Sequence, residues 1–317
     1  MPSPAEPAII LGADGFLGRH LVRYFAAQGW PVHPVGRGGG DLADRDTTLR
    51  LLAAAPRAGR IFHLATRQRT GPVQYGIQGE LLAVNASIHL NVLEAWRLHQ
   101  PQAKLISAGS SCAYPELPTP IPETAFQTGK LHPSVRGYGL AKQLLAEGSA
   151  VYGEQYGLCW LHCVLATVYG PFDHKEPERA HFMTALIARA VPGWRAGEWH
   201  FEVWGSPENR RDLLYVDDQI EAILAADRAF SDTILNVSAN RPVSIGAAAA
   251  AIRDCLGWQA EIVHPPGSFN GAAFKSIDAG RFLAQTGWRP RFSLADGIRA
   301  VLAIEYGIKP TEPNCTG

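Results

Sequence analysis

The stretch PAIILGADGFLGRHLVRYFAAQ, residues 7–28, indicates the fold of the whole chain. Residues 7–12 form an apolar run of strand length, and apolar residues then recur at helical spacing from Gly15 onward. Three glycines stand between these segments in a GxxGxxG pattern. Glycine lets the backbone approach a pyrophosphate, which the free N–H groups of a helix start can bind. The sequence therefore predicts a dinucleotide site at Gly12, Gly15, Phe16, Leu17 and Gly18.

Short apolar runs and helical patterns continue to alternate after this stretch. Further strands are predicted at 31–35, 60–65, 104–110 and 158–166, and helices at 45–55, 80–99 and 138–157. The alternation predicts an α/β fold: a doubly wound, Rossmann-type parallel sheet covered on both faces. The rhythm loosens after about residue 170. We therefore expect a dinucleotide-binding domain over residues 1–170 and a smaller C-terminal α/β domain over 171–317, mainly for substrate, with interleaved segments.

The composition excludes several classes of partner. Lys plus Arg equals Asp plus Glu, 29 against 29 in 317 residues, so we expect no nucleic acid and no anionic membrane as partner. There is no apolar run of about 18 residues, and MPSPAEPAIILG has no basic region before its apolar run, so neither a membrane span nor a signal peptide is expected. The five cysteines are irregularly spaced and form no CxxC, which argues against disulfides and a metal site. We expect a cytoplasmic protein.

The end of the second predicted strand bears on the choice of cofactor. Dinucleotide sites for NAD place an acid at this strand tip, whereas an arginine suits the 2′-phosphate of NADP. Here the tip reads Gly36-Arg37, and Asp41 follows four residues later. The sequence thus favours NADP through Arg37, with NAD as the alternative, and Asp41 and Leu42 are expected to cover the adenine ring. The competing interpretation of Arg37 is a solvated side chain in a loop.

Two further segments are predicted to carry chemistry. Tyr138 and Lys142, in YGLAK, are four residues apart and share one face of a helix. A neighbouring cation favours the phenolate, so Tyr138 is a candidate to move a proton at a carbonyl or carbinol. Ser110, Ser111 and Cys112 follow the strand at 104–110, at the edge where parallel sheets bind ligands. The alternative for Cys112 is small apolar filling at a strand end.

These segments together resemble the extended short-chain dehydrogenase/reductases over nearly the whole chain. The resemblance rests on the glycine pattern, HLA at 63–65, Asn85, the serine strand end, YGLAK, YGP at 169–171 and RRDLLYVDD at 210–218. It implies a Rossmann domain followed by a nucleotide-sugar domain. It also implies cofactor contacts at Leu64 and Ala65 as well as Tyr138 and Lys142. A homodimer formed through the helix at 79–99 and the Tyr138 helix is the expected assembly.

Within that group, GSSCAYP at 109–115 resembles the GSSCIYP of GDP-L-fucose synthases, the GDP-4-keto-6-deoxymannose 3,5-epimerase/4-reductases. This resemblance implies that Cys112 is the base and His181 the acid in inverting carbons 3 and 5. Thiols and imidazoles titrate near about 8.5 and 6.5, which suits proton transfer. Reduction of the 4-keto group by NADPH would then use Tyr138 and Lys142. Cys112-Ala113 stands where the 4,6-dehydratases have an Asp-Glu pair, which argues against dehydration.

The same resemblance implies a set of substrate contacts. Ser110 and Ser111 would hold the carbonyl oxygen, and His174 competes with His181 for the role of acid. The remaining contacts implied for the sugar nucleotide are Arg189, Arg211 and Lys275, and Trp204 is a further candidate to line the sugar site.

Three positions depart from the fucose-synthase pattern: Thr167 replaces an asparagine, Asp14 replaces an arginine, and TRQRT at 66–70 replaces small residues. The departures keep several alternatives open. One is a related 4-keto sugar nucleotide as substrate. Others are a 4-keto reductase without epimerase activity, or a 3,5- or 5-epimerase without net reduction. A non-catalytic NADP-binding module is the remote alternative, since such proteins typically lose the Tyr or Lys that this chain keeps.

Overall fold

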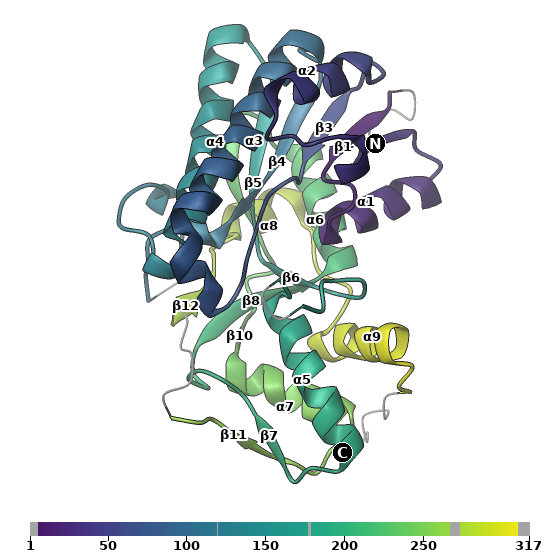
Figure 1. Ribbon diagram of the computed structural model, residues 1–317, viewed down its shortest axis with the longest axis vertical. Coiled ribbons are helices and arrows are strands. Elements are labelled where there is room, and N and C mark those ends of the chain that lie inside the picture. The colour runs from purple at the N-terminus through teal and green to yellow at the C-terminus, as the bar shows by residue number, and fades with distance from the viewer. Residues whose placement is uncertain (1–5, 119, 177–178, 267–272, 310–317) are drawn as a thin grey trace.

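The computed structural model describes residues 6–309, apart from residues 119, 177–178 and 267–272. Figure 1 shows a larger lobe that carries the N-terminal half of the chain and a smaller lobe built around α5, α7 and α9. The larger lobe contains a six-stranded parallel sheet in the order β2–β1–β3–β4–β5–β9. Its strands are β1 Ala8–Leu11, β2 Val32–Val35, β3 Arg60–His63, β4 Lys104–Ser110, β5 Trp160–Leu165 and β9 Thr233–Val237.

Helices cover both faces of this sheet, as the alternation predicts, so the predicted Rossmann-type fold is confirmed. Ile9 packs in the cluster that holds Leu52 and Trp96, whereas its neighbour Ile10 packs in the cluster that holds Phe25 and Phe282. Successive residues of a strand therefore point to opposite faces of the sheet, and both faces are buried. Each fully buried aliphatic side chain contributes about 1.5–3 kcal/mol. The helices are α2 Arg45–Ala54, α3 Gln78–His99 and α4 Arg136–Tyr156 on one face, and α1 Phe16–Ala27, α6 Val216–Ala229 and α8 Gly280–Thr286 on the other.

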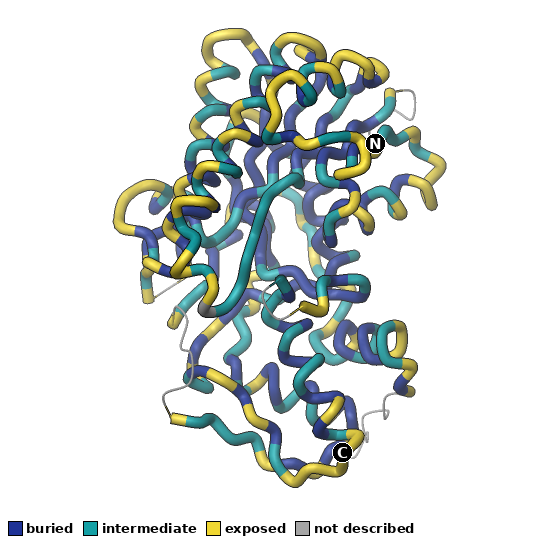
Figure 2. The backbone as a smooth tube through the Cα atoms, in the orientation of Figure 1, coloured by how far each residue is buried: buried dark blue, intermediate teal, exposed yellow. Residues whose placement is uncertain are grey.

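The strand order places a ligand crevice at a defined edge. From β1 the chain moves to β2 on one side and then to β3 on the other, so the order reverses at β1. In doubly wound sheets, ligands bind outside the carboxyl ends of the strands at this reversal. Figure 2 shows the central strands of this sheet as mostly buried and the outer surfaces of the helices as exposed, whereas the edge strand β2 is only partly buried.

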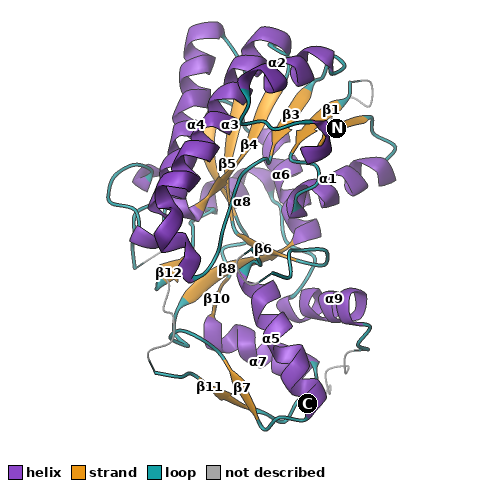
Figure 3. Ribbon diagram, viewed as in Figure 1, coloured by secondary structure: helices purple, strands orange, loops and turns teal. Residues whose placement is uncertain are grey.

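The smaller lobe has its own apolar core. Met183, Ile187, Ile252, Ile298 and Leu302 form part of it. Its helices are α5 Phe182–Ala196, α7 Ile245–Cys255 and α9 Leu294–Tyr306 (Figure 3). Its strands are β6 Thr167–Tyr169, β8 Arg210–Tyr215, β10 Pro242–Ser244 and β12 Phe274–Lys275 in one sheet, with β7 His200–Glu202 and β11 Glu261–Val263 as a separate parallel pair.

The chain crosses between the lobes more than once. After residue 170 it returns to the larger lobe with α6, β9 and α8, consistent with interleaved segments. The boundary at residue 170 itself stays a prediction. Short 3-10 helices complete the fold: η1 Arg37–Gly39, η2 Pro72–Ile77, η3 Ser111–Ala113, η4 Glu123–Ala125 and η5 Pro133–Val135.

The alternation of strands and helices loosens after about residue 170 in the sequence, yet the structure there still contains a long regular helix. The structure forms α5 over Phe182–Ala196, with Pro192 inside it. Met183, Leu186, Ile187 and Ala190 lie at helical spacing and are all buried. Their packing outweighs the hydrogen bond that Pro192 cannot make, because tertiary burial supplies most of the stability of a helix.

The sequence bears on disulfides, membrane-spanning helices and metal sites, and the structure bears on all three for the residues that it describes. Cys112, Cys159, Cys163 and Cys255 are reduced thiols rather than halves of a disulfide, and the fifth cysteine, Cys315, lies outside the described residues. None of the described helices combines the length and the apolar character needed to cross a membrane. Within the same residues, no group of three or more His, Cys, Asp or Glu side chains is arranged to hold a metal ion.

Candidate active site

A cavity of about 1120 Å³ opens at the carboxyl ends of β1, β3 and β4 and is also lined by α5, β8 and β12. Ligand pockets usually measure about 300–1,000 Å³, so there is room for a cofactor together with a substrate. The cavity brings together all the predicted catalytic and substrate-binding residues. These are Ser110, Ser111, Cys112, Tyr138, Lys142, His181, Arg189, Trp204, Arg211 and Lys275. Of the predicted cofactor residues, it is lined by Gly12, Gly15, Phe16, Leu17, Gly18, Arg37 and Leu64.

The glycine loop has the close packing that a pyrophosphate site requires. A Cβ atom on Gly18 would lie 2.1 Å from the oxygen of Gly12, and one on Gly12 would lie 2.7 Å from the nitrogen of Ala65. Gly12 also has a φ of +89°, a conformation that favours glycine. Helix α1 begins at Phe16 without a side-chain cap and without an acid in its first turn. Its N–H groups and dipole therefore suit a phosphate, and the loop fits a dinucleotide.

Three predicted cofactor residues lie outside the cavity lining that the structure describes. Asp41 accepts a hydrogen bond from the nitrogen of Ala43 at 2.9 Å, and Leu42 is buried in the core. Ala65 contacts the glycine loop through its backbone. A role for Asp41 and Leu42 over the adenine ring stays a prediction. The structure does bring an acid to the tip of β2, since Asp14 Oδ2 accepts from the Arg37 nitrogen at 2.7 Å. This acid comes from the glycine loop after β1, so the residues that follow β2 in the sequence do not indicate it.

The Tyr138 helix packs closely on the strand end that carries the serines and the cysteine. A Cβ atom on Gly139 would lie 2.3 Å from the Cys112 carbonyl oxygen, so the small residue inside YGLAK permits this approach. Cys112 N donates to Ser110 Oγ at 3.2 Å, which begins the short helix η3. Lys142 Nζ donates to the Ala108 carbonyl of β4 at 2.8 Å. Strand β4 and helix α4 thus fix the candidate catalytic groups relative to each other.

Burial controls the titration of this pair. Tyr138 and Lys142 are only 7% and 2% exposed. Burial raises the pKa of Tyr138, with a smaller contribution from the charge of Cys112, while hydrogen bonds with Thr66 and Ser110 act in the opposite direction. Burial also lowers the pKa of Lys142 to about 7, although the charge of Cys112 favours the ammonium. The cation of Lys142 is expected to favour the phenolate, but burial has the larger effect on Tyr138. Tyr138 remains a protonated phenol, because loss of water outweighs the nearby cation.

Thr66 is a site residue that sequence reasoning did not identify. The buried Asn85 accepts hydrogen bonds through Oδ1 from Thr66 Oγ1 at 2.9 Å and from the Arg67 nitrogen at 2.7 Å. Its amide nitrogen donates to the Arg67 carbonyl at 2.9 Å. Asn85 thereby holds the segment after β3 so that Thr66 meets Tyr138. The sequence signal was the combination of HLA and Asn85, which marks this segment but not the contact to Tyr138.

Cys112 lies among cations. Lys275 Nζ donates to the Cys112 sulfur at 3.6 Å. Burial lowers the pKa of Arg211 to about 10, while the charge of Cys112 acts to raise it. Lys142 receives the same influence from Cys112. Reactive cysteines occupy such electropositive, partly exposed surroundings, and Cys112 is partly exposed.

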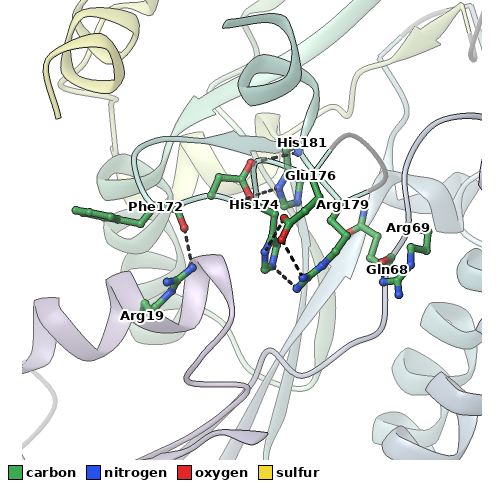
Figure 4. Close-up of polar contacts among 9 residues, drawn as sticks. Arg19, Gln68, Arg69, Phe172, His174, Glu176, Arg179 and His181 are labelled. Carbon is green, nitrogen blue, oxygen red and sulfur yellow. Dashed lines mark hydrogen bonds and ion pairs between the residues drawn. The ribbon is translucent and has the colours of Figure 1, made fainter. Parts of the chain in front are cut away.

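The two candidate histidines, His174 and His181, have different partners (Figure 4). His181 immediately precedes α5, and its Nδ1 lies 2.9 Å from Asp173 Oδ1. His174 Nε2 lies 3.1 Å from Arg179 Nη2, and burial lowers the pKa of His174. Both histidines line the cavity. Of the two rings, only that of His181 has a carboxylate oxygen within hydrogen-bond distance, since His174 Nδ1 lies 3.9 Å from Glu176 Oε2. His181 is therefore the better supported of the two as a proton donor.

Arg189 and Trp204 form a stacked pair at the cavity. The Arg189 guanidinium lies 3.8 Å from the centre of the Trp204 ring, a cation–π contact. Trp204 Nε1 donates to Glu202 Oε1 at 2.6 Å, and Trp204 is 46% exposed. The pair therefore offers both a positive charge and a flat apolar surface to a ligand.

The cavity is strongly cationic although the chain has no net charge. No Asp or Glu lines it in the part of the chain that the structure describes. Low-dielectric clefts lined by one sign of charge concentrate ligands of the opposite sign, so the cavity suits two diphosphate-bearing molecules. The cationic side chains that line it are Arg37, Arg67, Arg69, Lys142, Lys175, Arg179, Arg189, Arg211 and Lys275.

Three buried histidines lie in the sheet and helices near Lys142. His63 Nε2 and His89 Nδ1 are 2.9 Å apart, and His162 Nδ1 lies 2.8 Å from Ser107 Oγ. Burial, and secondarily the charge of Lys142, lowers the pKa of His63 and of His162 to about 3 and that of His89 well below its usual value. The three imidazoles are therefore neutral in the folded protein at neutral pH.

These histidines should make stability depend on pH. The unfolded chain takes up protons below about pH 6.5, whereas folded His63 and His162 do so only near about pH 3. The unfolding free energy should thus be at its full value above about pH 6.5. As the pH drops below this, it should fall by about 1.4 kcal/mol per pH unit for each histidine. The unfolding free energy can be measured with denaturant at a series of pH values. In His162→Gln its slope against pH should be smaller than in the wild type by about one proton. The exposed His99 provides the control, since His99→Gln should keep the wild-type slope. Equal slopes for all three proteins would contradict the assignment.

The chain matches known proteins in sequence. Residues 8–238 match the model of the NAD dependent epimerase/dehydratase family. GDP-L-fucose synthase 1 of Arabidopsis thaliana is 31% identical over 221 residues, which cover 69% of this chain and 68% of that protein. The GDP-L-fucose synthase of Sinorhizobium fredii strain NBRC 101917 / NGR234 is 27% identical over 292 residues, covering 91% of this chain and 92% of that protein.

Solved structures show the same fold. A GDP-6-OMe-4-keto-L-xylo-heptose reductase from C. jejuni superposes with a TM-score of 0.86 at 19% identity, covering 96% of this chain and 98% of the other. A GDP-mannoheptose C4 reductase from Campylobacter jejuni with NADP bound has a TM-score of 0.84 at 21% identity, covering 97% and 100%. The match to the family model covers well over half of the chain. The chain therefore belongs to the NAD dependent epimerase/dehydratase family.

Proposed function

We propose that the protein is an NADP-dependent nucleotide-sugar epimerase/reductase that acts on a GDP-4-keto-6-deoxymannose-like substrate. The observation that carries the proposal is the single cavity lined both by Tyr138, Lys142 and Ser110 and by Cys112 and His181. The first set suits reduction of a carbonyl, and the second suits proton transfer at the neighbouring carbons. The likeness to GDP-L-fucose synthases supports this class of substrate.

The cofactor proposed is NADP, with NAD as the alternative. When bound, it supplies the hydride that reduces the 4-keto group. The glycine loop and the start of α1 would hold its pyrophosphate, and Arg37 would meet its 2′-phosphate. The carboxylate of Asp14 accepts a hydrogen bond from the Arg37 backbone, and its negative charge reduces the preference for NADP over NAD.

Cys112 and His181 would carry the epimerisation. A 4-keto group acidifies the hydrogens on carbons 3 and 5, so one group must remove a proton and another must return it from the opposite face. Cys112 is proposed as the base, among the cations Lys275 and Arg211. His181 is proposed as the acid, and Ser110 and Ser111 would stabilise the enolate oxygen.

Tyr138 would protonate the carbonyl oxygen during reduction. Its raised pKa keeps the proton available for transfer, and its hydrogen bond with Ser110 places the hydroxyl beside the second group that can bind the oxygen. Lys142, whose pKa is lowered to about 7, can exchange a proton near neutral pH and would assist Tyr138. The diphosphate and sugar are assigned to Arg189, Trp204, Arg211 and Lys275.

The assembly proposed is a cytoplasmic homodimer formed through α3 and α4. Half of the large apolar side chains that the structure exposes among the described residues lie on these helices, namely Leu90, Leu98, Leu140, Val151 and Tyr156. Exposed apolar surface of this kind is typical of an interaction face. A cysteine pattern without a disulfide framework is consistent with a reducing compartment.

A 4-keto reductase without epimerase activity is the second candidate. The contact between Cys112 and Lys275 favours it, since the sulfur then has a role in holding a substrate-binding lysine. In that enzyme the thiol would move no proton.

Replacing Cys112 separates the two candidates. In heavy water, wild-type enzyme with NADPH and GDP-4-keto-6-deoxymannose should give a product with deuterium at carbons 3 and 5. Cys112→Ser should lower the incorporation by about 10²-fold or more, because the base is lost. Cys163→Ser is the control, since Cys163 is buried outside the cavity. NADPH consumption and deuterium content that are unchanged in Cys112→Ser would refute a catalytic thiol, and consumption without deuterium in the wild type would establish the reductase.

A further inference from the structure

A buried carboxylate lies against the candidate acid His181. The side chain of Asp173 is 0% exposed, and His181 Nδ1 lies 2.9 Å from its Oδ1. The backbone nitrogen of His181 donates to Asp173 Oδ2 at 3.1 Å. The nitrogen of His174 donates to Oδ1 at 2.8 Å. One carboxylate thus holds both the ring and the main chain of His181 at the start of α5, in the position that Figure 4 shows for His181.

The carboxylate determines which imidazole nitrogen carries the hydrogen. Burial acts to raise the pKa of Asp173, but hydrogen bonds and charge from His181, and hydrogen bonds from Thr184 and the His174 backbone, outweigh it and lower the pKa. Asp173 is therefore ionised at neutral pH, and an ionised carboxylate can only accept. His181 Nδ1 must be the donor, so Nε2 is the nitrogen left to exchange a proton with a ligand.

Sequence reasoning did not identify Asp173, and the function proposed above does not use it. We propose that Asp173 is a positioning residue: it fixes the tautomer and orientation of His181 so that Nε2 returns the proton during epimerisation. The inference rests on the proposed function for its catalytic meaning, but the tautomer can be measured without it. Charge stabilisation of a protonated imidazole by a buried carboxylate is the physical basis, as in other His–Asp pairs.

A merely structural role is the competing explanation. Asp173 accepts from the backbone N–H groups of His174 and of His181, the residue before α5, so its loss would loosen the helix start whether or not it serves the His181 ring. The test therefore needs a readout that a looser helix would not produce. Asp173→Asn is the informative variant, since asparagine keeps the size but has one acceptor oxygen for four donors: the ring and backbone nitrogens of His181, the backbone nitrogen of His174, and Thr184. Asp173→Glu restores the carboxylate.

Nitrogen NMR of the ligand-free protein measures the tautomer directly. With ¹⁵N-labelled histidine, at a pH where the spectrum shows a neutral ring, His181 should show hydrogen on Nδ1 and a bare Nε2. His181→Asn identifies its signals. In Asp173→Asn the Nδ1-protonated form should give way to a mixture or to the Nε2-protonated form. An unchanged tautomer in Asp173→Asn would overturn the proposal, whatever the enzyme acts on. Thermal unfolding of both proteins checks that the variant is folded.

The catalytic role is tested by measuring two quantities together: deuterium exchange at carbons 3 and 5 of the keto sugar, and inversion of configuration at the same carbons. With NADP⁺ in place of NADPH, GDP-4-keto-6-deoxymannose stays at the ketone level, so only proton transfer is observed in heavy water. Without a competent acid, Cys112 can still remove a proton and return deuterium to the same face. The ratio of inversion to exchange should thus fall by about 10²-fold in Asp173→Asn and in His181→Asn, with recovery in Asp173→Glu. Inversion and exchange that fall equally would identify a structural role and overturn the proposal. If wild-type protein shows no exchange, the proposed function fails, and the NMR result alone decides the tautomer.

Discussion

Tyr138→Phe is expected to reduce NADPH-dependent turnover of the keto sugar by about 10³-fold, the usual contribution of a positioned general acid. The variant removes the hydroxyl that hydrogen-bonds with Ser110 and Thr66 but keeps the ring that fills the same buried place. Because burial holds that hydroxyl in its protonated form, it is the proton source assigned to the reduced oxygen. The rate of NADPH absorbance loss measures the effect, and NADPH fluorescence should show little change in cofactor affinity.

Tyr114 supplies a matched control for this variant. It is a buried tyrosine whose hydroxyl donates to Asn236 Oδ1 at 2.7 Å, and it does not line the cavity. Tyr114→Phe should lower the unfolding free energy by about 1 kcal/mol and keep the turnover rate, because it removes a buried hydrogen bond only. Turnover that survives in Tyr138→Phe, or is lost equally in Tyr114→Phe, would contradict the assignment of Tyr138.

Gly18→Ala should weaken NADPH binding by about 10²-fold or more, because the glycine loop must let its backbone approach the pyrophosphate closely. The added Cβ would lie 2.1 Å from the Gly12 oxygen and 2.9 Å from the Ala13 Cα, both in the rigid backbone of the glycine loop. The loop must therefore move away from its present position at the start of α1. Fluorescence titration with NADPH measures the affinity. The rise in unfolding temperature on adding NADP⁺ gives a second measure if binding becomes too weak to titrate.

Gly79→Ala is the control for the glycine experiment. Gly79 lies near the start of α3, and a Cβ there would meet nothing within 4 Å. Alanine favours helix over glycine, so this variant should be as stable as the wild type or up to about 1 kcal/mol more stable, with unchanged NADPH affinity. Wild-type affinity in Gly18→Ala would contradict the place assigned to the pyrophosphate.

The parts of the molecule that the sequence predicts are those set by local patterns. The strand–glycine–helix order of residues 7–28 specifies β1, the loop and α1, and the helical spacing of YGLAK places Tyr138 above Lys142. The apolar runs specify the strands, whose carboxyl ends necessarily meet at one edge of the sheet. Ser110 and Cys112 are therefore at the site because of where their strand ends.

The parts that the sequence does not predict depend on contacts between distant segments. Thr66 meets Tyr138 only because Asn85 holds the chain after β3, and Asp14 reaches the tip of β2 from a different loop. The titration of Tyr138 could not be predicted either, since it depends on how little water reaches both it and Lys142. Helix spacing predicts that two groups are near each other, but not the dielectric around them.

The most direct test of the central claim is a single wild-type reaction in heavy water with NADPH and GDP-4-keto-6-deoxymannose. NADPH absorbance follows the reduction, and the mass and NMR spectrum of the product follow the proton transfers. The account predicts that one NADPH is consumed for each product molecule and that the product carries deuterium at both carbon 3 and carbon 5. Consumption of NADPH with no deuterium at either carbon would contradict it, since Cys112 and His181 would then share the cavity with Tyr138 without moving a proton.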